Sequence, residues 1–159
     1  MTTTRPAPRP ADQRREAVLE RLRTEEDVWV ATANPRGVPC LVPLSVHWDG
    51  DAVWLSTRGA NPTGRNLLET SAVRISFGDT RDVVLIDGSV EAFSLDEVDP
   101  ADADAFAARC GWDPRRAKRP GSPYLYFRVT PTDVQAFHGE HELTGRHLMR
   151  DGLWTVPAD

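Results

Sequence analysis

The stretch from Val38 to Phe77 reads VPCLVPLSVHWDGDAVWLSTRGANPTGRNLLETSAVRISF, and its pattern decides the fold class. A run of strand-forming residues over about 38–48 leads into Asp49-Gly50, a dipeptide typical of tight hairpin turns. A second strand over 52–57 follows directly. Strands joined by a tight turn are antiparallel. This excludes a doubly wound parallel sheet, because that fold needs a helix between successive strands.

Strand-forming runs on both sides of this stretch extend the sheet. Before it, residues 28–33 (VWVATA) lead into Asn34-Pro35-Arg36-Gly37, whose residue types are those of a type I turn. After it, we expect strands at 72–77, 82–93 and 124–138, a bend at Asp87-Gly88 and a short terminal piece at 153–156. Five or six antiparallel strands with few helices close into a small barrel. The sequence therefore predicts a mainly β protein, an antiparallel barrel of about six strands.

Three helices are expected to flank this barrel. Asp12 is a candidate N-cap for an N-terminal helix over 13–24. Asn61-Pro62 starts a short helix that reaches about Glu69, with proline at the first helical position. Asp99-Pro100 opens a later helix. Its apolar side chains recur at helical spacing, which predicts packing on the sheet: Ala103, Phe106, Ala107 and Cys110.

Composition bounds the rest of the chain. Its 159 residues are 40% hydrophobic and 27% charged, which is typical of one soluble domain. Residues 1–11 (MTTTRPAPRPA) contain three prolines, so we expect a flexible N-terminal lead followed by a single domain over 12–159. The net charge of −5 argues against nucleic-acid binding, and no apolar run is long enough for a membrane span. Two distant cysteines and the lack of a secretory signal favour a cytoplasmic location.

The segment Leu55–Leu67 combines the features of an anion-binding site. A strand ends in hydroxyl and guanidinium side chains, and a helix then begins, whose free N–H groups and dipole favour a phosphate. At Gly64 the lack of a Cβ lets an oxygen approach the backbone. The alternative is a capped helix whose arginines face water. The residues expected around a phosphate are Ser56, Thr57, Arg58, Thr63, Gly64, Arg65 and Asn66.

Other chemistry has less support in the sequence. The run from Gly59 to Asn66 falls short of a nucleotide P-loop, because Arg65 and Asn66 stand where that motif needs lysine and a hydroxyl. His138, His141 and His147 do not predict a metal site, since glycines interrupt any helical register between them. The basic run at 115–119 is expected to be a solvated loop. No motif of a hydrolytic nucleophile is present.

Residues 37–77, together with the strand DVVLIDGSVE at 82–91, resemble the pyridoxamine-phosphate-oxidase-like flavin and deazaflavin reductases. That resemblance implies a split β-barrel, usually a homodimer with its cofactor in a cleft between subunits. It implies that the ring lies along the second strand at Pro43, Leu44 and Ser45, and that the helix start takes the cofactor phosphate. It also suggests that Trp154 of a partner subunit completes the ring pocket.

The resemblance implies an oxidoreductase that transfers hydride between FMN or coenzyme F420 and a small conjugated or heteroaromatic substrate. No protein nucleophile is needed, and Ser45 and His47 are candidate donors of a hydrogen bond or a proton. In the F420 case, the basic run at 115–119 is a candidate contact for the coenzyme's polyglutamate tail. The alternative is a non-catalytic barrel that binds flavin, haem or a tetrapyrrole. Leu41, Val46 and Thr63 favour that alternative, because they stand where the vitamin oxidases carry basic side chains.

Overall fold

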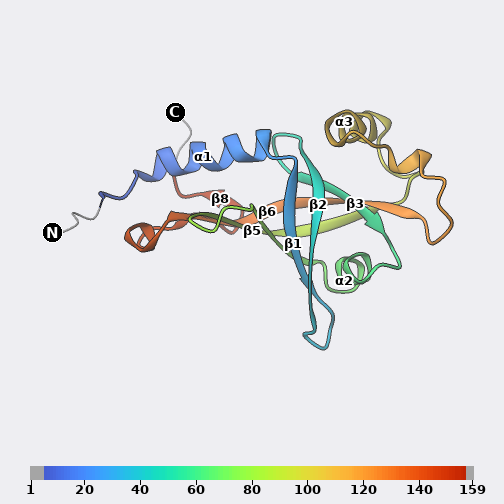
Figure 1. Ribbon diagram of the computed structural model, residues 1–159, viewed down its shortest axis with the longest axis horizontal. Coiled ribbons are helices and arrows are strands. Elements are labelled where there is room, and N and C mark those ends of the chain that lie inside the picture. Colours follow the sequence, from blue (N-terminus) through green and yellow to red (C-terminus); the bar gives the residue numbers. More distant parts are fainter. Residues whose placement is uncertain (1–5, 157–159) are drawn as a thin grey trace.

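One antiparallel sheet organises the computed structural model, which describes residues 6–156 (Figure 1). Its strands are β1 (Asp27–Ala33), β2 (Pro39–Trp48), β3 (Val53–Arg58), β4 (Ala72–Ser76), β5 (Asp82–Phe93), β6 (Tyr124–His138), β7 (His147–Arg150) and β8 (Leu153–Trp154). The strand order is β3-β2-β1-β4-β5-β6-β7-β8, and β3 also pairs with β6. Six strands therefore form a closed antiparallel barrel, which confirms the predicted fold class.

Strand β6 closes the barrel. Along one edge of β6, different parts of the strand pair with different neighbours. Its first part pairs with β3, from Tyr124 opposite Arg58 to Val129 opposite Val53. Further along, the same edge pairs with β7, which extends the sheet beyond the barrel. The other edge of β6 pairs with β5, with the register shift predicted at Asp87-Gly88. A Cβ on Gly88 would lie 2.5 Å from Val129 Cγ1, so the bend needs glycine at this position.

Two helices cover opposite sides of the barrel strands, as Figure 1 shows: α1 (Ala11–Thr24) and α2 (Pro62–Thr70). Both bury apolar side chains in the main core, Val18 and Leu22 from α1 and Leu67 from α2. The expectation that Asp12 caps α1 is wrong, because the helix begins at Ala11 after Pro10 and has no side-chain cap. None of the helices within residues 6–156 has the length and apolarity that crossing a bilayer requires.

The third helix, α3 (Pro100–Cys110), begins as predicted, with the Asp99 carboxylate accepting from the Ala101 amide at 2.8 Å. It packs on the outside of the barrel and creates a second, aromatic core. Phe106 of α3 meets Tyr126 of β6 edge to face, with ring centroids 5.5 Å apart. A 3-10 turn at Pro114–Arg116 follows within the predicted loop.

The segment after β6 is more ordered than the sequence indicated. It contains a 3-10 turn (Glu140–Glu142) and β7, neither of which was predicted, and the terminal strand β8 is shorter than expected. Glu142 is fully buried. Its carboxylate accepts from the Arg9 guanidinium at 2.8 and 2.9 Å, from the Arg9 amide at 2.8 Å and from the His138 amide at 2.6 Å. Arg9 also pairs with Asp82, so this part of the predicted lead is bound to the barrel, while residues 1–5 lie outside the described residues.

Candidate functional site

The outer face of strands β2, β1, β4 and β5 is a broad sheet surface, on which α3 packs against β2. Residues of adjacent strands are paired across it, for example Leu41 with Ala31, Ala31 with Arg74, and Arg74 with Asp87. Large apolar side chains are exposed on it, with Trp29 at 43% and Leu41 at 61% of their full exposure. Exposed apolar surface of this kind is typical of a binding or subunit interface.

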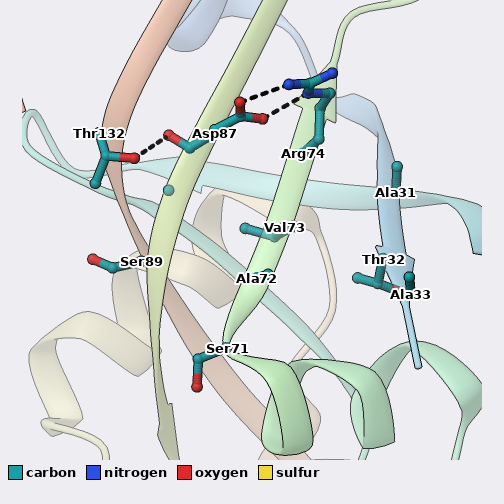
Figure 2. Close-up of a pocket in the computed structure, with 11 residues that line it drawn as sticks. Ala31, Thr32, Ala33, Ser71, Ala72, Val73, Arg74, Asp87, Ser89 and Thr132 are labelled. Atoms are coloured by element: carbon teal, nitrogen blue, oxygen red, sulfur yellow. Dashed lines mark hydrogen bonds and ion pairs between the residues drawn. The ribbon is translucent and has the colours of Figure 1, made fainter. Parts of the chain in front are cut away.

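A shallow hollow of about 560 Å³ lies on this face beside the end of α2 (Figure 2). Small side chains from three strands line its floor, which is why the surface is depressed there: Ala31, Ala33, Ala72, Gly88 and Ser89. Arg74 and Asp87 border the hollow and form a two-point ion pair, with N–O distances of 2.6 and 2.7 Å. That pairing occupies both charges, so the hollow itself offers little free charge.

The three residues predicted to contact a cofactor ring lie along β2 but do not share one face. Pro43 is exposed on the outer face, in register with Trp29. Leu44 points the other way and packs against the main core. Ser45 returns to the outer face, where its hydroxyl donates to the Asp27 carboxylate at 2.7 Å. A planar ring on this face can therefore contact the side chains of Pro43 and Ser45, and Leu44 only through its backbone.

His47, the other candidate proton donor, lies on the same face of β2 as Pro43 and Ser45, near α3. Burial lowers the pKa of its imidazole, the positive charge of Arg109 acts in the same direction, and the carboxylates of Asp49 and Asp102 oppose the shift. A lowered pKa favours the neutral imidazole, which can either donate or accept a hydrogen bond. Burial also raises the pKa of the nearby Cys110 thiol to about 11, so Cys110 is not a reactive thiolate at neutral pH.

The start of α2 packs directly on the end of β3. A Cβ added to Gly64 would collide with the backbone carbonyl of Arg58. The oxygen that requires glycine here thus belongs to the chain itself, whereas the sequence suggested a ligand oxygen. The contact places the first turn of α2 beside the end of the barrel.

The polar side chains predicted around a phosphate are brought together, but they are buried and bonded within the chain. Ser56 donates to the Leu125 carbonyl at 2.8 Å, and Thr57 accepts from the Asn61 amide group at 3.2 Å. The Thr63 hydroxyl lies 3.5 Å from Cys40 Sγ, and the Asn66 amide donates to the Thr32 hydroxyl at 3.0 Å. These contacts join β3, α2 and the β1–β2 pair.

Arg58 faces the loop before β6, away from the start of α2. Its guanidinium donates to the carbonyls of Ser122 at 2.8 Å and Arg119 at 2.9 Å. It also stacks on Tyr124, 4.7 Å from the ring centroid. The geometry gives Arg58 a clear structural role, and its part in holding a phosphate stays a prediction.

A cavity of about 440 Å³ lies between the tip of the β1–β2 hairpin and α2. Arg65 of α2 and Arg36 of the hairpin turn both line it, together with Pro62, Cys40 and Glu69. Within residues 6–156 neither guanidinium has a hydrogen bond or an ion pair, in contrast to Arg58. The sequence predicts Arg65 at this site but not Arg36, which lies within a turn motif.

The histidines near the C-terminus and the basic run at 115–119 make local pairs. No cluster of metal-binding side chains occurs among the described residues, and His147 instead lies 3.3 Å from the Asp133 carboxylate. In the basic run, Arg115 pairs with Asp113 at 2.9 Å and with Asp104 at 2.7 Å. The run therefore carries less free positive charge than its sequence indicated.

Comparisons with known proteins agree with this architecture. The family described as pyridoxamine 5'-phosphate oxidase matches residues 15–138. A solved structure named F420 reductase is 21% identical with a TM-score of 0.57, and the match covers 72% of this chain and 93% of that one. A pyridoxamine 5'-phosphate oxidase-related, FMN-binding protein from Nostoc punctiforme is 18% identical with a TM-score of 0.56, covering 83% and 86%. HutZ, the haem storage protein from Vibrio cholerae, is 14% identical with a TM-score of 0.60, covering 80% and 98%.

No curated protein sequence matches significantly. The structural similarities lie below the identity at which a shared activity follows, and they support the fold. The family match spans the barrel from α1 to the end of β6, and it agrees with the closed antiparallel barrel and its two extra strands. The chain therefore belongs to the pyridoxamine 5'-phosphate oxidase family of split β-barrels.

Proposed function

We propose that this protein binds a flavin-type cofactor, FMN or F420, and uses it as an oxidoreductase. The observation that carries the proposal is the cavity between the hairpin tip and α2, where Arg36 and Arg65 present unpaired guanidinium groups beside a helix start. Phosphate groups bind well where helix N–H groups and arginines meet. The family match and the similarity to an F420 reductase and an FMN-binding protein support the choice of cofactor class.

The ring of the bound cofactor is proposed to lie on the outer face of β2, against Leu41 and Pro43. Both side chains are exposed there, and the strip continues to Trp29 and the hollow on β4 and β5. A second copy of this chain is the proposed cover for the strip, so that a homodimer completes the cofactor cleft. Size-exclusion chromatography with light scattering tests this arrangement.

Once bound, the cofactor supplies the hydride chemistry, and the protein supplies placement and proton control. The Ser45 hydroxyl donates its hydrogen bond to the Asp27 carboxylate, which leaves the oxygen lone pairs of Ser45 free to accept from a group on the outer face. The lowered pKa of His47 favours a neutral imidazole near neutral pH, which can donate a hydrogen bond to the substrate. The proposed acceptor is a small conjugated or heteroaromatic molecule. A cytoplasmic site for this reaction is supported by the free cysteines Cys40 and Cys110.

Titration with FMN and with F420 tests the proposed phosphate site. Arg65→Ala and Arg36→Ala are each expected to weaken binding of the preferred cofactor about 10-fold or more, because each removes a charge-assisted contact. Arg150→Ala is the matched control, since it removes the same charge from an exposed position on β7. Equal affinity of all three variants and the wild type would remove this cavity from the proposal.

Haem binding without catalysis is the second candidate, favoured by the similarity to HutZ. The buried, internally bonded hydroxyls around α2 also leave fewer donors for a phosphate than the sequence indicated. Absorption spectra of the protein titrated with haemin and with FMN separate the two functions. A stoichiometric Soret band shift without any flavin binding supports the haem function and contradicts the oxidoreductase.

A further inference from the structure

A separate cavity of about 710 Å³ lies beside α1, and no residue of α2 lines it. It is formed by α1, the β2–β3 turn and the β7–β8 turn. Its volume is within the range of small-molecule sites, about 300–1,000 Å³. No residue lines both this cavity and the cavity beside α2, and Trp154, which the family resemblance suggested for the ring pocket of a partner subunit, lines this one.

Aromatic and apolar side chains line this cavity together with charged ones. Trp48 at the end of β2 and Trp154 in β8 both line it, with Leu19 of α1 and Met149 of β7. The two indole rings are partly exposed, so part of their surface is available for contact. Flat aromatic side chains of this kind favour a flat aromatic partner, because ring pairs add to the gain from apolar burial.

Arg15 gives the cavity its polar anchor. Its guanidinium lies over the Trp154 ring, 4.8 Å from the centroid, and its buried Nε has no hydrogen-bond partner among the described residues. Stacking uses the face of a guanidinium and leaves its N–H edge for a carboxylate in the same plane. The neighbouring Arg14 also has a buried Nε without a partner among the described residues, but its Nη1 donates into the protein, to the carbonyls of Ala136 and Glu142.

The other charged groups around the cavity are already engaged or face solvent. Arg23 pairs with Glu16 at 3.0 Å and with Glu20 at 3.6 Å. The Asp49 carboxylate accepts from the amides of Asp51 and Ala52 and from the Trp54 indole. Asp51 is exposed in the turn. Arg15 is therefore the lining charge that has no carboxylate partner within residues 6–156.

We propose that this cavity is a second ligand site, which binds a planar aromatic carboxylate. Its ring contacts Trp48 and Trp154, and its carboxylate pairs with the edge of the Arg15 guanidinium. The ligand carboxylate supplies the ion-pair partner that the Arg15 guanidinium lacks among the described residues. This site is independent of the cofactor that the outer face of β2 receives.

Calorimetric titration with 2-naphthoate and with the uncharged 2-naphthalenemethanol tests the proposal. The wild type is expected to bind the carboxylate about 10-fold more tightly than the alcohol, because only the carboxylate forms charge-assisted bonds with Arg15. Arg15→Gln is expected to abolish that preference and to leave the affinity for the alcohol unchanged. Trp154→Leu is expected to weaken both ligands.

Two variants control for general effects. Arg150→Gln removes a positive charge from β7 outside the cavity, and Arg65→Ala changes the proposed phosphate site; both are expected to keep the preference for naphthoate. The proposal is overturned if the wild type does not bind naphthoate or binds both compounds equally. It is equally overturned if Arg150→Gln or Arg65→Ala loses the preference. If Arg15→Gln does not fold, as judged by circular dichroism, the wild-type preference and the Trp154→Leu result decide.

Discussion

Gly64→Ala is expected to lower the free energy of unfolding by about 3 kcal/mol, because the new methyl group meets the Arg58 carbonyl. Backbone on both sides of this contact limits relaxation: the end of β3 is held in the barrel by β6, and the first turn of α2 is packed on it. Urea denaturation followed by circular dichroism measures the change. Because α2 must shift away from β3, cofactor affinity is expected to fall in the same variant.

Gly78→Ala is the matched control for this substitution. Gly78 has no atom within 4 Å of the position of a new Cβ, and it carries no positive φ. Its unfolding free energy is expected to stay within about 0.5 kcal/mol of the wild type, as for most surface changes. If both alanine variants are equally stable, the close approach of α2 to β3 is not as described.

Glu142→Ala is expected to cost about 3 kcal/mol of stability at pH 7, in the range for breaking a buried ion pair. The substitution leaves the Arg9 guanidinium and the His138 amide without the acceptor that they share. Glu16→Ala is the control, because Glu16 pairs with Arg23 on the exposed surface of α1, where such pairs contribute little. Thermal and chemical unfolding compare the two variants, and a Glu142 variant as stable as the Glu16 variant contradicts the structural role of this pair.

The same carboxylate predicts a pH dependence. Hydrogen bonds from Arg9 lower the pKa of Glu142 to about 2, against an ordinary value of 4.5. A carboxylate whose pKa is depressed in the folded state stabilises the protein at pH values above its pKa in the unfolded chain. This contribution is lost as the pH falls from 4.5 towards 2. Glu142→Gln is expected to lack this part of the acid-induced loss. A Gln variant whose stability falls as steeply as the wild type over that interval would show that Glu142 is not its source.

Much of the fold could be predicted because its long strands carry local signals. The strands at 82–93 and 124–138 match their predicted bounds, and the Asp87-Gly88 bend appears where the glycine indicated. The four residues of β7 were missed, because a strand this short has no readable alternation. Its position depends on a free edge of β6 beyond β3, which is a property of the closed barrel rather than of its own residues.

The candidate site was only partly predictable, because many of its contacts join residues that are distant in the sequence. In the run from Ser56 to Asn66, hydroxyl and guanidinium side chains lie at a strand end and a helix start, as the sequence predicts. Their bonding depends on distant partners, since Ser56 donates to Leu125 and Arg58 to the carbonyls of Arg119 and Ser122. Arg36 reaches the site because the β1–β2 hairpin lies beside α2, and no local pattern around the turn contains that information.

The way in which β6 completes the barrel has a consequence for synthesis on the ribosome. Strands β1 and β2 can pair as soon as they emerge, but β3 cannot find its outer neighbour until residues 124–129 have been translated. Contacts between such distant segments form late and slow the final step of folding. We therefore expect nascent chains that stop before residue 124 to remain sensitive to proteases, with the edge of β3 open to chaperones.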